Sequence, residues 1–180
     1  FMPMIGMGIT VSILVGQSLG ANNEDMADRA TTSAVQMAFI YMGSIAAMYL
    51  LLPSMFIYPF AANADPTEFE EIRGYAMTAM KFVAAWSLVD SLGIVYSSAL
   101  KGAGDTRFTM YTIIVLSVIL LILPTFIALE VMGWGLEAAW TIGLVYIIGL
   151  AVVFTLRYRE GKWKTMRVIE QSTFEDPGQD

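Results

Sequence analysis

The chain has 180 residues, of which 57% are hydrophobic and 14% are charged, and its formal net charge is −6. Soluble domains carry roughly 45–50% apolar and about 25% charged residues, so this composition indicates a membrane protein and not a nucleic-acid-binding one. The absence of cysteine and histidine excludes disulfides and zinc–thiolate sites, and it leaves carboxylates as the groups able to handle protons.

Five apolar stretches are long enough to cross a bilayer as helices, which takes about 20 residues. They lie near residues 1–20, 31–59, 74–100, 108–129 and 134–156. Because lipid cannot satisfy an open backbone, we expect helices, and the second stretch can tilt or break at Pro53. The sequence therefore predicts an all-α, polytopic membrane bundle over residues 1–157, followed by a partly disordered tail, 158–180. Since Phe1 already lies inside an apolar run, we expect the C-terminal part of a longer protein.

Positive charge is distributed unevenly around these stretches. If the chain crosses the membrane five times, eight of the ten Lys and Arg residues fall on one side. They are Arg29, Lys101, Arg107, Arg157, Arg159, Lys162, Lys164 and Arg167. Because cytoplasmic loops are enriched in Lys and Arg, the pattern predicts a multi-pass protein of the inner or plasma membrane with a cytoplasmic C-terminus.

Two short polar turns on this side, residues 20–23 and 102–105, resemble each other. Each places Gly where a helix C-terminus favours a left-handed residue, and then Asn or Asp where an N-cap is favoured. The likeness suggests an internal repeat, which is common in secondary transporters. The candidate inner gate comprises Gly102, Gly104, Asp105 and Arg107. For Asp105 and Arg107, the alternative is an N-cap followed by a residue of the positive side.

Asp90 is the strongest candidate for chemistry, because it is the only acid between Glu71 and Asp105. An intramembrane carboxylate costs about 2.5–3.5 kcal/mol on insertion scales and usually faces a bundle interior or a water-filled path. Helical spacing predicts that the cavity around Asp90 is lined by Trp86, Ser87, Gly93 and Ser97. We interpret Asp90 as a site that exchanges a proton or binds a sodium ion. The alternative is a structural Asp that is protonated or bonded to a neighbouring helix.

Other features are predicted to be structural or interfacial. The aromatic residues expected in interfacial belts are Tyr58, Trp134, Tyr158 and Trp163. Glu137, near the outer end of the last stretch, is interpreted as interfacial, with lining of a transport path as the alternative. The sequence contains no nucleotide-binding glycine loop, no Ser–His–Asp set and no metal-ligand cluster, so we do not expect an enzyme.

Two motifs resemble the C-terminal half of multidrug and toxic compound extrusion (MATE) transporters. The first lies in residues 5–30 and comprises Gly8, Ser12, residues 14–21 and Ala27. The second is Asp90 followed, ten positions later, by residues 100–107. The pair of motifs, spaced correctly among the stretches, makes the resemblance fairly specific, and it covers residues 1–157.

The resemblance implies a transporter of twelve helices in two six-helix lobes that exports organic cations in exchange for sodium ions or protons. The five stretches would be helices eight to twelve, so part of the C-terminal lobe. Asp90 matches an acid on the tenth helix that belongs to a cation site, while a partner acid on the seventh helix would precede Phe1. Where some members carry an aromatic hydroxyl, four residues before this acid, the chain has Trp86.

The implied partners are an organic cation, membrane lipid and the N-terminal lobe of the same protein, with no cofactor beyond the coupling ion. Two alternatives remain. A flippase of lipid-linked saccharides, from the same superfamily, would need several cations to meet a phosphate, and Lys81 is the only cation within the stretches. A non-transporting membrane scaffold would leave Asp90 dispensable.

Overall fold

The computed structural model describes residues 1–61 and 66–166, and the regular elements among them are all helical. The α-helices are α1 (Met2–Gly20), α2 (Glu24–Leu51), α3 (Pro53–Ala61), α4 (Pro66–Gly102), α5 (Thr106–Leu116), α6 (Leu123–Phe126) and α7 (Leu136–Arg159). Wider π-type turns, Ser117–Ile122 and Ile127–Val131, join α5 to α6 and extend α6, so Thr106–Val131 forms one rod. A 3-10 turn, Lys162–Thr165, follows α7.

Five of these helical stretches are long and apolar enough to cross a membrane, which confirms the predicted all-α class. They are Met2–Gly20, Glu24–Leu51, Ile72–Gly102, Thr106–Val131 and Leu136–Arg159. The second helix, α2, ends at Leu51, whereas the predicted stretch continued to residue 59. Leu52 leaves the helical conformation, with φ −130° and ψ 47°, because the ring of Pro53 disfavours the helical region for the residue before it. Pro53 then begins the separate helix α3.

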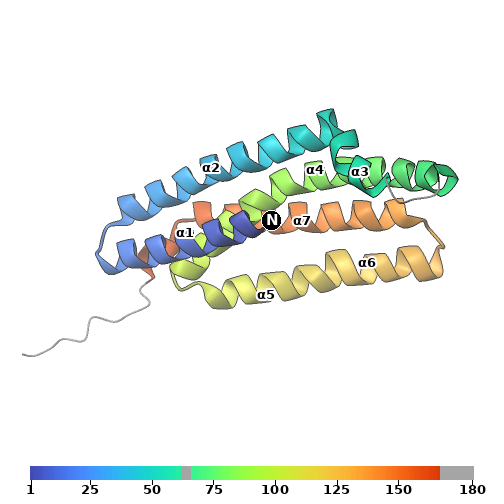
Figure 1. Cartoon of the computed structure of the whole chain (residues 1–180). Helices are drawn as coiled ribbons and strands as arrows, with labels where there is room; N and C mark the ends of the chain where they lie inside the picture. Colours follow the sequence, from blue (N-terminus) through green and yellow to red (C-terminus); the bar gives the residue numbers. More distant parts are fainter. Residues whose placement is uncertain (62–65, 167–180) are drawn as a thin grey trace, which may run out of the picture.

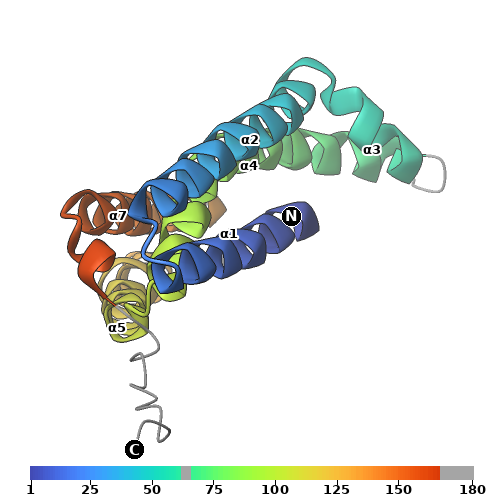
Figure 2. The same cartoon turned by 90° about the vertical axis from the view of Figure 1, so that its left-hand side faces the viewer.

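Helix α4 is the centre of the bundle, since it packs against α1, α2 and α7 (Figures 1 and 2). The rod Thr106–Val131 lies beside α7, on the side away from α2 (Figure 1). The α1–α2 turn, the α4–α5 turn and the end of α7 meet at one end of the bundle, which we call the basic end (Figure 1). The segments that join α2 to α3 and the rod to α7 lie at the opposite end.

Small residues allow α1 and α4 to cross closely. A Cβ atom on Gly102 would collide with the backbone oxygen of Ser12, and a Cβ atom on Gly8 would come within 2.8 Å of the Ser98 hydroxyl. A Cβ atom on Gly16 would lie 3.1 Å from the carbonyl oxygen of Gly102. Such four-residue spacing of small side chains is typical of membrane helices, in which van der Waals packing drives association. The crossing fixes the position of α4 relative to α1.

An aromatic cluster closes the basic end. Gly161, with φ +72°, reverses the chain after α7, and Trp163 returns to the bundle with only 1% of its surface exposed. Its ring stacks on Tyr158 at 4.8 Å between centroids, and its Nε1 donates to the Tyr158 carbonyl oxygen at 2.8 Å. Tyr158 also contacts the Tyr96 ring at 5.0 Å and donates from its hydroxyl to Oδ1 of Asp28 at 2.8 Å.

This cluster corrects the interpretation of Tyr158 and Trp163 as interfacial belt residues, because both are buried. A ring at the membrane interface keeps its polar edge in water, whereas both polar groups here bond within the protein. Packing also continues past residue 157, where the bundle was expected to end. Residues 167–180 of the expected tail lie outside the described residues.

Candidate functional site in the groove between α1 and α4

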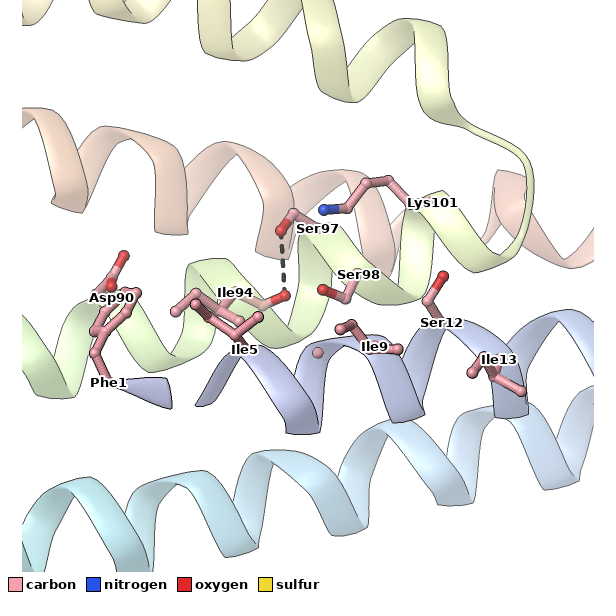
Figure 3. A pocket seen from close by; sticks show the side chains of 11 residues that line it. Phe1, Ile5, Ile9, Ser12, Ile13, Asp90, Ile94, Ser97, Ser98 and Lys101 are labelled. Atoms are coloured by element: carbon pink, nitrogen blue, oxygen red, sulfur yellow. Dashed lines mark hydrogen bonds between the residues drawn. The ribbon is translucent and has the colours of Figure 1, made fainter. Parts of the chain in front are cut away.

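A groove of about 420 Å³ runs between α1 and α4 and contains Asp90 (Figure 3). Its polar lining residues are Ser12, Asp90, Ser97, Ser98 and Lys101. The side chains of Ile5, Ile9 and Ile13, spaced four apart on α1, form much of the apolar wall. The groove thus combines an apolar wall from α1 with a line of polar groups from α4.

The groove contains two charged residues, with Asp90 beside Phe1 at one end and Ser12 and Ile13 lying beyond the Lys101 side chain at the other (Figure 3). Asp90 and Lys101 are eleven positions apart on α4, which corresponds to about 16 Å along a helix axis. The Lys101 side chain extends back along the groove toward Ser97 (Figure 3). At this separation the two charged groups do not pair, and each remains available to other groups.

The Asp90 carboxylate is half-buried and forms no hydrogen bond or ion pair with any residue of the described part of the chain. Burying a charged group is unfavourable unless a partner compensates it. The structural alternative, a carboxylate bonded to a neighbouring helix, therefore has no support among the described residues. The geometry leaves Asp90 open to a proton or a cation that enters the groove.

The serine hydroxyls of α4 use their hydrogens within the helix. Ser87 donates to the carbonyl oxygen of Ala84 at 3.0 Å, and Ser97 donates to that of Ile94 at 3.1 Å. Their oxygen lone pairs stay free to accept or to ligate. However, Ser97 follows Asp90 by about 10 Å along the helix, so the two do not bind one small ion together. Among the described residues no three acidic side chains gather as a metal site.

The single face predicted around Asp90 is divided between two neighbouring helices. Ser97 lies in the groove with Asp90, whereas Trp86 contacts Trp140 of α7 at 6.2 Å between ring centroids. A Cβ atom on Gly93 would lie 3.8 Å from the α7 backbone. Residues three or four apart on a helix differ by about 40–60° in direction. On a helix wedged between α1 and α7, that difference is enough to give Asp90 and Trp86 different neighbours.

At the basic end, Asp105 bonds across the bundle and not within its own turn. It occupies the N-cap position of α5 but makes no capping hydrogen bond, and its Oδ2 accepts from Nε of Arg157 at 2.8 Å. The Arg157 guanidinium also lies 4.5 Å from the centroid of the Phe108 ring and donates to Glu160 at 3.2 Å. Arg107, the predicted gate partner, is exposed. Sequence reasoning placed Arg157 only among the residues of the positive side.

The two polar turns share one geometry, although the left-handed residues differ from those predicted. Asn22, with φ +55°, and Gly104, with φ +97°, take this role in place of Gly20 and Gly102. In each turn the residue after the left-handed one donates its N–H to a carbonyl five positions earlier, at 2.8 Å in the first turn and 2.9 Å in the second. This pattern is a Schellman motif. Asn23 then caps α2, because its side chain accepts from a first-turn amide at 3.0 Å.

Comparison with known proteins places this geometry in a family context. The MatE family model matches residues 1–127, which include Asp90 and both polar turns. A probable multidrug resistance protein NorM from Thermotoga maritima is 21% identical over 179 residues, covering 99% of this chain and 37% of that protein. A probable multidrug resistance protein NorM from Mesorhizobium japonicum is 27% identical over 110 residues, covering 61% of this chain and 23% of that protein.

A solved structure of a MOP superfamily transporter from Pyrococcus furiosus has the same fold. It superposes with a TM-score of 0.76 at 19% identity, over 91% of this chain and 36% of that one. The chain therefore spans less than two fifths of the length of these relatives.

Proposed function

This chain belongs to the MatE family of transporters, and we propose that it forms part of the C-terminal lobe of a secondary antiporter that exports organic cations or drugs in exchange for H⁺ or Na⁺. The five membrane-spanning helices and the multidrug resistance relatives support export as the activity. The observation that carries the proposal is the unpaired Asp90 carboxylate in the groove between α1 and α4.

In this proposal Asp90 binds the coupling ion or proton from the outer side. Occupancy neutralises the Asp90 charge, which the residues of the groove otherwise leave unpaired. The neutral and charged forms then favour different arrangements of the two lobes, which is the differential affinity that any coupled conformational change requires. Alternation between these arrangements would expose a central cavity first to one side of the membrane and then to the other.

The charge distribution supports a cytoplasmic position for the basic end. Among the described residues, cations at this end include Lys101, Arg107, Arg157 and Arg159, whereas Glu137 lies in the first turn of α7 at the opposite end. An excess of Lys and Arg on one side marks the cytoplasmic face. We accordingly propose an inner or plasma membrane protein with α7 ending in the cytoplasm.

Transport by the full-length protein in proteoliposomes tests the proposal. Efflux of ethidium is measured with a proton gradient alone and with a sodium gradient alone, for the natural sequence, Asp90→Asn and Asp25→Asn. Asp25 is an exposed acid at the basic end and serves as the matched control. We expect Asp90→Asn to lower gradient-driven efflux by at least about tenfold, because the neutral side chain cannot cycle between charge states. Asp25→Asn should leave it unchanged.

The gradient that drives the natural protein identifies the coupling ion. Full efflux by Asp90→Asn would exclude Asp90 as the coupling site. If neither gradient drives efflux from the natural protein, the antiporter proposal fails and the flippase or scaffold alternatives gain support.

A further inference from the structure

A second cavity, separate from the Asp90 groove, lies between α4 and α7 toward the end opposite the basic end. Its volume is about 710 Å³, and it shares no lining residue with the groove between α1 and α4. The side chains that give it chemical character are Tyr75, Thr78, Glu137 and Trp140. Pockets of roughly 300–1,000 Å³ suit drug-sized ligands, so this cavity has room for one.

Glu137 supplies a negative charge at the mouth of this cavity. It lies in the first turn of α7, where the helix dipole favours a carboxylate. Its side chain is exposed and forms no ion pair within the described ranges 1–61 and 66–166. Trp140 follows three positions later and so shares the same face of α7. The carboxylate and the indole ring are thus presented together.

Aromatic neighbours hold the Trp140 ring in place. Phe82 of α4 stacks on it at 6.3 Å between centroids with an interplanar angle of 18°, and Trp86 meets it edge-on at 6.2 Å with 66°. Such pairs favour one orientation over others. Trp140 is therefore a fixed wall of the cavity, while Tyr75 adds a second, largely exposed ring from α4.

A fixed aromatic wall beside an unpaired carboxylate is the chemistry that recognises an organic ammonium ion. Ring faces attract a cation through their quadrupole, and the attraction grows as water is excluded. The apolar groups of the same ligand can pack against the rings, which a hydrated metal ion cannot do. The combination selects for charge and apolar bulk together.

We propose that this cavity is a binding site for a hydrophobic organic cation, with Glu137 balancing the charge and the Trp140 and Tyr75 rings contacting the apolar groups. The proposal rests on the proposed function for its ligand class and for the outer location of this end. It adds a site that the exported cation occupies near the outer face, apart from the Asp90 groove that binds the coupling ion.

Thiol labelling tests the site without requiring transport. The chain contains no cysteine, so a single Thr78→Cys marks this cavity and a single Ser12→Cys marks the groove between α1 and α4. The full-length protein, with any other cysteines replaced, reacts with methyl methanethiosulfonate in the presence or absence of benzyltrimethylammonium. We expect the cation to slow labelling of Thr78→Cys by about tenfold at saturation, and its uncharged isostere neopentylbenzene to protect far less.

Substitutions then identify the groups responsible. Glu137→Gln and Trp140→Leu should each weaken protection at Thr78→Cys by about threefold to tenfold in apparent affinity. The labelling rate of Ser12→Cys without ligand should stay constant in both variants, which shows that the bundle remains folded. Asp90→Asn should leave protection at Thr78→Cys intact, even where it abolishes transport.

Three results would overturn the proposal: no protection by the cation, equal protection by the uncharged isostere, or protection that Glu137→Gln leaves undiminished. A parallel change at Ser12→Cys would also overturn it, because the variant would then act on the whole bundle. Loss of Asp90-dependent efflux bears on the proposed function alone, so the two ideas fail separately.

Discussion

Arg157 at the end of α7 and Asp105 at the start of α5 form an ion pair of 2.8 Å, and the two side chains are only 17% and 9% exposed. The pair joins two helices whose contacting residues are 52 positions apart in the chain. Because little solvent reaches it, screening is weaker than for a surface pair. It ties the α4–α5 turn to α7, together with the contact of the same guanidinium with Phe108.

Removing one member of this pair should destabilise the protein. Arg157→Met leaves the Asp105 carboxylate buried without its partner, and we expect a loss of about 2 kcal/mol in the free energy of unfolding. The measurement is thermal or denaturant unfolding of the full-length protein in detergent. Arg107→Met, at an exposed position in the same turn, should change stability by less than about 0.5 kcal/mol.

A double-mutant cycle isolates the interaction of Arg157 with Asp105. Asp105→Asn combined with Arg157→Met should lose less than the sum of the single changes, because no charge remains unpaired. Strict additivity would mean that the contact contributes nothing to stability.

Gly102→Ala should disrupt the crossing of α1 and α4. The new methyl group meets the Ser12 backbone, which cannot rotate away as a side chain would. Overpacking of this kind costs about 1–3 kcal/mol. Gly20→Ala is the matched control, since a methyl group there would meet no described residue outside its own turn of helix within 4 Å, and it should be neutral or slightly stabilising. Both are compared by the thermal midpoint, and equal effects would contradict the role assigned to the crossing.

Trp163→Ala should be strongly destabilising, although this residue follows the last membrane-spanning helix. Loss of a fully buried Trp side chain costs about 3–5 kcal/mol. Trp163→Phe keeps a ring to stack on Tyr158 but loses the bond from Nε1 and part of the buried volume, so it should cost less, about 1–3 kcal/mol. Trp134, which is 53% exposed, provides a control whose replacement by Ala has a much smaller effect. Similar losses at both tryptophans would contradict the buried position of Trp163.

Asp90→Asn should not destabilise the protein, in contrast to Asp105→Asn. The Asp90 carboxylate has no partner among the described residues, so neutralising it removes an uncompensated charge and should raise the free energy of unfolding by up to about 1 kcal/mol. A gain in stability with a loss of transport is the expected trade-off at a functional residue. Unfolding of both variants at neutral pH decides the matter, and a loss of stability in Asp90→Asn would favour the structural alternative.

The sequence alone could predict the parts of this fold that depend on local chemistry. The lengths of the apolar stretches were enough to predict all five membrane-spanning helices, because crossing a bilayer takes about 20 apolar residues. Leu52 leaves the helical conformation because the next residue is Pro53, so two adjacent positions decide where the helix ends. Asn23 caps its helix for a similarly local reason, since its side chain needs only the amides of the next turn.

The contacts that could not be predicted join distant positions. Asp105 has an Arg two positions away, yet it pairs with Arg157, because the crossing of α4 and α7 brings that guanidinium within reach. Likewise, helical spacing put Trp86 beside Asp90. Which helix each side chain faces, however, depends on where α1 and α7 pack against α4. The cavity at Glu137 could not be predicted either, because its wall combines residues of α4 with residues at the start of α7.

The docking of Trp163 has a consequence for biosynthesis. Translation proceeds from the N-terminus, so Trp163 emerges only after all five membrane-spanning helices have been made. Until then Tyr158 lacks the ring that stacks on it, and the aromatic cluster at the basic end stays incomplete. Burial of this one indole ring therefore completes the basic end only after α7 has left the ribosome and packed against α4.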